Sequence, residues 1–409
     1  MQSPVFKPAD ILIPKDVPIF SWSTVACDQY SSEPEYWEKA RNAASTQPST
    51  YHMIYPECYL GVTNAEEYID GINRTMRQYL DCGVFETLED SYVYVERTLA
   101  TGRLRRGIVG ALDLDAYEYT PGNRAPVRAT EGTVAERIPP RVLIRQNAPL
   151  ELPHVMILID DPEHTVIEPV TELIDELPLA YSGRLMLGGG SIRGHRLFGG
   201  MAKMVDLALD KLSSQKEMVF AVGDGNHSLA SAKACYEQLK RKLPKEQWST
   251  HPARYALVEI VNLYDNSLEF EPIHRIVQEV NPDHLLNELN RFYNLSPSPD
   301  GSEKLTYIIG GRESCVWVKN PPSPLTVGTL QKFLDDYKGK TPCRIDYIHG
   351  DEVVKKLSQK KNAVGFLLPP MDKKLLFPAV MADGVLPRKT FSMGHAEDKR
   401  YYLECRKIR

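Results

Sequence analysis

The stretch VFAVGDGNHSLASAK, residues 219–233, decides the fold of this chain, since an apolar run, a polar turn and an alanine-rich segment follow one another in it. The apolar run at 219–222 is typical of a buried strand. Gly223 and Gly225 permit backbone angles and close approaches that a side chain would prevent. Ser228 to Tyr236 contains three alanines and no Gly or Pro, which favours a helix. We therefore predict a strand, a tight turn and a helix.

The turn in this unit is unusually polar, because Asp224, Asn226, His227 and Ser228 stand where the helix begins. The first turn of a helix leaves N–H groups unpaired and carries a partial positive charge, so phosphate and other anions bind there readily. A capping role for Asp224 or Asn226 explains one or two of these residues, but not all of them together. We interpret the turn as a functional loop, with helix capping as the alternative.

Composition and charge limit the possible classes of protein. The chain has 409 residues, of which 42% are hydrophobic and 25% charged, as in a globular protein large enough for two domains. The net charge of −5 argues against a surface that coats nucleic acid, although a local basic patch is compatible with it. No apolar run is long enough to span a membrane and the N-terminus lacks signal-peptide features, so we expect a cytoplasmic protein.

The cysteines and histidines form no known framework. The seven cysteines are irregularly spaced without a CxxC pair, and the motifs HxxxH and HExxH are absent. This pattern is typical of reduced intracellular thiols rather than of disulfides or a zinc site. The Gly-rich segment 187–200 matches neither a P-loop nor the dinucleotide fingerprint GxGxxG.

Hydrophobic periodicity predicts alternating helices and strands along the rest of the chain. The predicted helices are 34–44, 64–80, 165–177, 201–214, 282–294, 325–337 and 351–358. The predicted strands are 92–99, 107–114, 155–159, 255–263, 305–309, 315–318 and 363–368. Because the pattern of the sequence changes near residue 300, we expect an N-terminal and central catalytic region at 1–299. A smaller C-terminal α/β region at 300–409 would be an independent module or a lid over the site.

Further polar groups lie outside the central turn, and each of them has a structural interpretation as well as a functional one. Arginine suits a bidentate grip on phosphate or carboxylate, and glutamate suits general-base work on a hydroxyl. An aspartate at a strand end can hold Mg²⁺ or begin a turn. Surface ion pairs would explain the basic groups equally well. The groups are Glu131 and Thr133 with Arg137, Asp160 with Asp161, His195 with Arg196, His274 with Arg275, and Lys389 with Thr390.

Together these segments resemble a large bacterial and archaeal family long described as uncharacterised. Its members carry a D-G-[HN]-H loop before a helix, an acidic-Thr segment, a T-H-R-like segment and a closing G-x-x-P-x-K-[ST] segment. The corresponding residues here are 224–227, 131–137, 273–275 and 384–390. The chain departs from the pattern at Asn226 and Ser228, where His and Arg-like residues are common. Residues 26–30 stand in place of the usual A-P-P-Y-D start.

The central loop also resembles the ParB/sulfiredoxin-like fold, whose members hold a nucleotide or phosphate at a G-x-H-R turn. The resemblance implies an α+β fold, in which a mixed-sheet core carries the strand-GDGNH-helix unit and additional α/β segments flank it. This fold hosts three chemistries, among which fold alone does not choose. Sulfiredoxin-like reductases need a cysteine in the turn, where this chain has Asn226, and ParB-like DNA clamps should be basic.

The third chemistry, that of the free-serine kinases, is the leading hypothesis. It implies a phosphotransferase that converts L-serine to O-phosphoserine with pyrophosphate, or ADP or ATP, as donor. We expect catalytic roles for Asp224, His227 and Glu131, the last as general base, and Mg²⁺ binding by Asp224 and Asp161. Contacts to phosphate or substrate are expected from Gly225, Asn226, Ser228, Thr133, Arg137, His195, Arg196, His274, Arg275, Lys389 and Thr390.

Three alternatives remain open at this point. The same site could run as a phosphoserine phosphatase. The chain could instead be a ParB-like protein that binds nucleic acid or a nucleotide, or a sensor of a phosphorylated metabolite. The acidic residues near the turn favour catalysis over sensing, because a pure anion sensor gains nothing from Asp224 or Glu131. The oligomeric state does not follow from the sequence.

Overall fold

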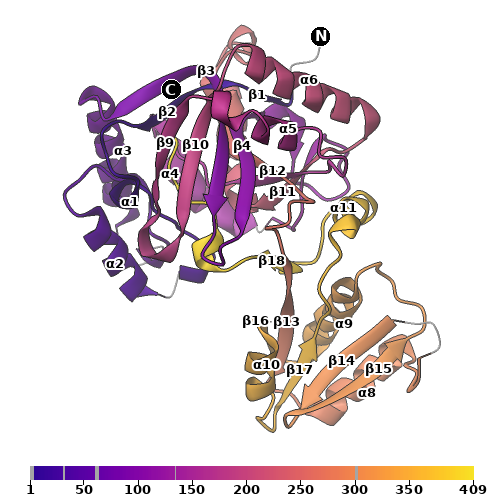
Figure 1. Ribbon diagram of the computed structural model, residues 1–409. Coiled ribbons are helices and arrows are strands. Elements are labelled where there is room, and N and C mark those ends of the chain that lie inside the picture. Colours follow the sequence, from indigo (N-terminus) through magenta and orange to yellow (C-terminus); the bar gives the residue numbers. More distant parts are fainter. Residues whose placement is uncertain (1–3, 31–32, 60–63, 134, 300–302) are drawn as a thin grey trace. The chain divides into compact units, whose positions relative to one another are not determined.

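The computed structural model describes all residues except 1–3, 31–32, 60–63, 134 and 300–302 (Figure 1). The chain forms two compact units, the first made of Met1–Leu268 with Gly394–Arg409 and the second of Glu269–Met393. This differs from the division expected at residues 299 and 300. Strand β13 (Phe270–Gln278) pairs with later strands and so belongs to the second unit. The C-terminal segment returns to the first unit through bridges such as Leu12 to Cys405.

The first unit is built on a mixed sheet of eleven strands, which confirms the expected α+β class. Its main order is β5-β6-β11-β8-β12-β4-β3-β10-β9, and β1 and β2 pair with β4 and β3. The pairs β6–β11 and β8–β12 are parallel, whereas β8–β11 is antiparallel. The strands are β1 (Phe6–Lys7), β2 (Ala9–Pro14), β3 (Phe85–Thr98), β4 (Leu104–Asp113), β5 (Tyr117–Glu118), β6 (Val127–Ala129), β8 (Met156–Ile159), β9 (Leu179–Arg184), β10 (Ser191–Leu197), β11 (Phe220–Asp224) and β12 (Tyr255–Asn262).

Apolar cores cover both faces of this sheet. Successive residues of a strand point to opposite faces. On β3, Val93 and Val95 accordingly join one core, while Tyr92 and Tyr94 join the other. Helices α1 (Ile19–Trp22), α2 (Pro34–Ala44) and α3 (Ala65–Asp81) pack on the first core, and α6 (Gly200–Gln215) and α7 (Asn226–Lys240) on the second (Figure 1). The remaining helices of the unit are α4 (Ile138–Arg145) and α5 (Glu168–Thr171).

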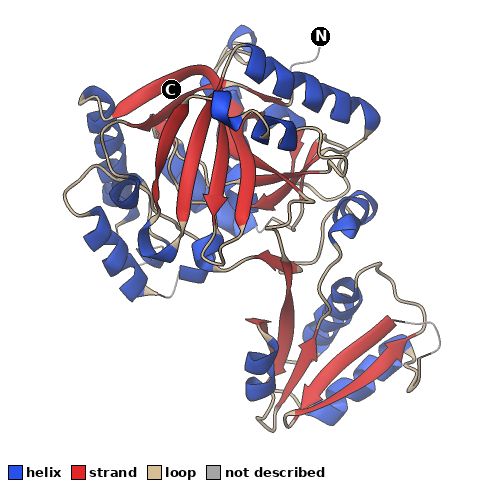
Figure 2. Ribbon diagram, viewed as in Figure 1, coloured by secondary structure: helices blue, strands red, loops and turns tan. Residues whose placement is uncertain are grey.

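The second unit holds a six-stranded sheet in the main order β15-β14-β17-β13-β16, with β18 paired to β13. Figure 2 draws its strands in red and its helices in blue. The predicted strand pair around Gly310 and Gly311 is confirmed as an antiparallel hairpin. Besides β13, the sheet of the second unit contains β14 (Glu303–Ile309), β15 (Arg312–Val318), β16 (Arg344–His349), β17 (Ala363–Leu367) and β18 (Phe391–Met393). The helices of the second unit are α8 (Pro282–Tyr293), α9 (Thr326–Lys340), α10 (Asp351–Leu357) and α11 (Leu376–Asp383).

The first unit also contains a separate two-stranded sheet, in which β7 (Leu150–Glu151) pairs with β19 (Arg406–Lys407).

One predicted element is wrong. Residues 165–177 do not form a continuous helix, because only α5 and a 3-10 turn at Ile174–Glu176 are helical there. Pro169 has no N–H, so it cannot bond the carbonyl of residue 165, and a helix cannot run through this position from 165. None of the helices in the described part of the chain has the length and apolar character that a membrane span requires.

Candidate functional site

The strand-turn-helix unit predicted from the sequence is present as β11, Gly225 and α7. Gly225 lies in the left-handed region at φ +82°, and a Cβ there would come 3.0 Å from the Val155 side chain. The N-cap residue of α7 is Gly225, which makes no side-chain capping bond. Asp224 does not cap the helix either, because its Oδ1 accepts from the N–H of Gly225 at 2.9 Å. The first turn of α7 carries the partial positive charge of a helix start, which favours an anion beside it.

The sheet brings two further segments to the edge where this turn lies. In the parallel pair β6–β11, Ala129 lies opposite Val222, so residues 130–133 leave the sheet beside the turn. The backbone N–H of Thr130 donates to Asn226 Oδ1 at 3.2 Å. Glu131 thus follows directly after a residue that is bonded to the turn, and Thr133 lies two residues further along the chain. In the antiparallel pair β8–β11, Met156 lies opposite Asp224, so the segment before β8 arrives at the same edge.

His154, which the sequence analysis missed, lies on that arriving segment. Its Nε2 is 2.7 Å from Ser228 Oγ, in the first turn of α7. Burial lowers the pKa of His154 to about 4, against the attraction of the Asp224 carboxylate, so its imidazole is neutral at pH 7. The atoms His154 Nδ1 and Thr133 Oγ1 are buried and have no hydrogen-bond partner among the described residues. These two atoms therefore have hydrogen-bonding capacity that no described residue uses.

A second missed residue, Lys399, comes from the C-terminal segment. Its Nζ lies 3.2 Å from Asp224 Oδ2. The backbone before it is held by two buried arginines of β3 and β4, which lie opposite each other in register. Arg97 donates to the carbonyl of Lys399, and Arg105 donates to that of Asp398 at 2.8 Å. The site thus combines a carboxylate, an ammonium group, a neutral imidazole and a serine hydroxyl.

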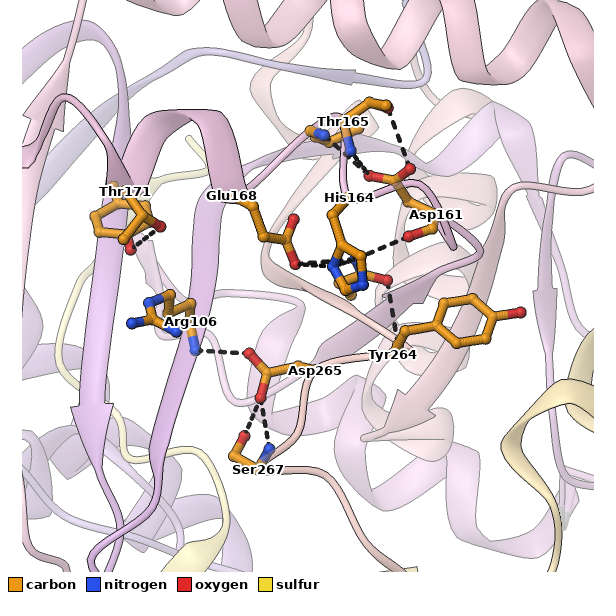
Figure 3. A network of polar contacts seen from close by, with 12 residues as sticks. Arg106, Asp161, His164, Thr165, Glu168, Thr171, Tyr264, Asp265 and Ser267 are labelled. Atoms are coloured by element: carbon orange, nitrogen blue, oxygen red, sulfur yellow. Dashed lines mark hydrogen bonds and ion pairs between the residues drawn. The ribbon is translucent and has the colours of Figure 1, made fainter.

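Asp161, expected as a Mg²⁺ ligand, lies away from this site. It is the second residue after the end of β8, whereas Asp224 pairs with the first residue of that strand, so the two aspartates stand at opposite ends of the antiparallel pair. The side chain of Asp161 is almost fully buried, and its Oδ2 accepts from the N–H groups of Thr165 and Val166 at 2.6 and 2.9 Å (Figure 3). Asp161 therefore stabilises the loop between β8 and α5.

His195 and Arg196 also lie outside the site. Both are on β10, and the strands β8, β12, β4 and β3 separate that strand from β11. As neighbours on a strand, their side chains point to opposite faces. Arg196 donates to Ser91 Oγ at 2.8 Å and to the carbonyl of Glu89 at 2.9 Å, while His195 is buried with Nδ1 3.3 Å from the carbonyl of Leu177. The structure does not bring this pair together on one anion.

The residues expected from the C-terminal half gather in the second unit. Arg275 is fully buried on β13 and donates to the carbonyls of Lys389 and Arg388 at 3.0 and 2.9 Å. Thr390 Oγ1 donates to the carbonyl of Pro387 at 2.6 Å. Arg275 therefore holds the loop 387–390 by its backbone.

His274, the neighbour of Arg275 on β13, faces other partners. Its Nε2 lies 2.8 Å from Asp351 Oδ1, and its Nδ1 accepts from the N–H of Leu368 at 3.0 Å. Burial lowers the pKa of His274 in spite of Asp351.

In the first unit, Arg137 is exposed in a short helical turn before α4, and its carbonyl accepts from Arg141 Nη1 at 3.2 Å.

Comparison with known proteins found no match among the curated sequences. Similar solved structures include free serine kinase in complex with AMP, with a TM-score of 0.39 and 10% identity over 72% of this chain and 98% of that one. They also include C-terminally truncated SbnI from Staphylococcus aureus, with a TM-score of 0.38 and 12% identity over 70% and 83%. Neither likeness is close enough to say what this chain does.

A conserved hypothetical protein from Pyrococcus furiosus is similar at a TM-score of 0.35 and 11% identity, over 73% of this chain and 90% of that one. One family model matches most of the sequence of this chain. Residues 7–337 match the model described as Protein of unknown function (DUF1015), and the chain belongs to that family.

Proposed function

We propose that this protein is a phosphotransferase that acts on a small-molecule hydroxyl, with L-serine as the acceptor and O-phosphoserine as the product. One observation carries the proposal. Asp224 with Lys399, and Ser228 with His154, converge on the start of α7, a helix of fifteen residues whose N-cap is a glycine. Phosphoryl transfer needs positioning and charge neutralisation more than covalent help, and these groups supply both.

Each group at the turn has a role in this proposal. The N–H groups at residues 226–228 and the Lys399 ammonium neutralise charge on the donor phosphate. His227, the second residue of α7, donates to the same phosphate. Asp224 orients Lys399 and the acceptor. Glu131, one residue after the Thr130 N–H that binds Asn226, accepts the proton of the acceptor hydroxyl.

The donor is pyrophosphate or a nucleotide, and the sequence lacks a P-loop, which favours pyrophosphate. Among the described residues, no three His, Cys, Asp or Glu side chains lie close enough to form a metal site. Mg²⁺ commonly takes one or two protein carboxylates together with substrate phosphates. A Mg²⁺ ion would therefore arrive with the donor and meet Asp224, whereas Asp161 at the other end of β8 would not reach it.

Phosphorus NMR of the full chain with L-serine and Mg²⁺ tests the proposal, with pyrophosphate, ADP and ATP in separate samples. We expect an O-phosphoserine signal with one donor, and its loss in Asp224→Asn and His227→Ala. Asp115→Asn is the matched control. Its partner Lys240 lies at 3.1 Å, its exposure of 37% is close to the 35% of Asp224, and the pair sits at the far end of α7. No product with any donor would contradict the proposal.

Other outcomes assign the site differently. Phosphate released from O-phosphoserine alone would identify a phosphatase that uses the same groups. Thermal stabilisation by a phosphorylated metabolite without turnover would identify a sensor. Salt-sensitive retention on DNA would identify a ParB-like binding protein.

A further inference from the structure

We propose that Ser228 is itself phosphorylated during turnover, with His154 as the base that activates it, so that the phosphoryl group passes through the enzyme. The inference rests on the proposed function and deepens it. It divides the transfer into two steps, which direct transfer from donor to L-serine does not require.

The geometry of the two side chains supports this role. The separation of 2.7 Å between Ser228 Oγ and His154 Nε2 is that of a nucleophile and its base. With its proton on Nδ1, the imidazole accepts the serine hydroxyl hydrogen at Nε2. The ring is held in place, since its centroid lies 4.9 Å from that of Tyr402 and the carbonyl of Pro153 accepts from Arg400 at 3.2 Å. The two groups come from segments that the β8–β11 pairing fixes together.

Neighbouring hydroxyl groups make a different kind of contact. Ser231, one turn further along α7, is buried and donates to the carbonyl of His227 at 2.7 Å. Thr130 Oγ1 donates to the carbonyl of Val222 at 2.6 Å. A peptide carbonyl is no base for a hydroxyl proton, whereas a neutral imidazole is. Ser228 thus differs from both residues in its partner and in lying partly exposed.

The first step forms one bond and breaks one. Ser228 Oγ attacks the terminal phosphorus of pyrophosphate or of the nucleotide, and its proton passes to His154 Nε2. The bond from that phosphorus to the bridging oxygen breaks, and phosphate or the shortened nucleotide leaves with the electron pair. Lys399 and the first turn of α7 lie beside the charge that this step rearranges.

In the second step Ser228 Oγ is the leaving group, whereas in the first it is the nucleophile. The acceptor hydroxyl attacks the phosphorus on Ser228 and gives its proton to Glu131. The bond between phosphorus and Ser228 Oγ breaks, and His154 returns its proton to that oxygen. Glu131 then releases the proton to water, which regenerates the enzyme with no change of oxidation state.

Peptide mass spectrometry of the full chain tests the inference. The protein is incubated with Mg²⁺ and pyrophosphate, ADP or ATP, without L-serine, and trypsin then releases residues 217–233, which contain Ser228, Ser231 and His227. We expect one phosphoryl group on Ser228, its absence in Ser228→Ala and its retention in the matched control Ser231→Ala. His154→Gln should slow its formation by roughly a hundredfold and remove the acid limb of the pH profile.

The outcomes separate this inference from the proposed function. If O-phosphoserine forms without a phosphorylated enzyme and Ser228→Ala still turns over, transfer is direct, which overturns the inference and leaves the phosphotransferase standing. If Ser228 is phosphorylated but L-serine does not accept the group, the inference holds and the acceptor is wrong. Phosphate on His227 or Ser231 instead would also overturn the inference.

Discussion

At the scale of single residues, a substitution of Lys399, whose ammonium group pairs with Asp224, tests the site without changing the core. Lys399→Met keeps the apolar stem and removes the ammonium group, so we expect kcat/KM to fall by about a hundredfold as phosphate charge loses its partner. Stability should change by less than about 1 kcal/mol, because Asp224 is 35% exposed and such pairs contribute little. Steady-state kinetics and thermal melting measure the two effects.

The matched control for this change is Lys240→Met. Its ammonium lies 3.1 Å from Asp115, and the side chains of Lys240 and Lys399 are both 14% exposed. Lys240 lies in the last turn of α7, away from the turn at Asp224. Equal loss of activity in both variants would show that Lys399 has no special place in the reaction.

His154 gives the site a pH dependence of stability. Its folded pKa is about 4, below the ordinary 6.5, so between these values the unfolded chain binds a proton that the folded chain does not. Stability is therefore undiminished above pH 6.5 and is lost as the pH falls towards 4. The loss is at most about 3 kcal/mol. Urea unfolding at several pH values should show a smaller loss in His154→Gln, and an identical pH dependence in both proteins would refute the assignment.

At the scale of elements, the geometry between β11 and α7 depends on Gly225. Gly225→Ala places a side chain at φ +82°, which costs about 1–2 kcal/mol, and presses Cβ against Val155. We expect both stability and turnover to fall, because the first turn of α7 shifts. Gly102→Ala is the control, since Gly102 has the same φ with open space around it, in the turn between β3 and β4.

The control variant should lose a similar amount of stability and keep its turnover. Thermal melting and kinetics of both variants separate strain from function. Full activity in Gly225→Ala would mean that the start of α7 does not position the reacting groups.

At the scale of the whole molecule, the C-terminal segment Gly394–Arg409 closes the first unit. The indole of Trp22 donates to the carbonyl of Leu403 at 2.7 Å, and the buried carboxylate of Glu404 pairs with Arg400 at 2.7 Å. We expect a chain that ends at Met393 to lose the cooperative melting of the first unit and to keep that of 269–393, which has its own sheet and helices. Calorimetry with limited proteolysis measures this, and two intact transitions would contradict it.

Local patterns in the sequence were enough to predict β11, the turn and α7, because an apolar run, Gly225 and an alanine-rich segment act over a few residues. They also predicted six further helices and seven further strands, but not strands such as β9 and β16. They did not predict the strands β10 and β13, which carry His195 with Arg196 and His274 with Arg275. On a strand, adjacent side chains face opposite ways, and here they bind separate partners.

What the sequence by itself determined is the polar turn with Asp224 and Ser228, because neighbours along the chain make it. Only the tertiary structure decided which distant residues join it. His154 arrives because β8 runs antiparallel to β11, and Asp161 is carried away for the same reason. Lys399 arrives because buried Arg97 and Arg105 bind the carbonyls of the returning C-terminal segment. Strand direction and the pairing of buried polar groups depend on contacts between segments far apart in sequence, which no local pattern encodes.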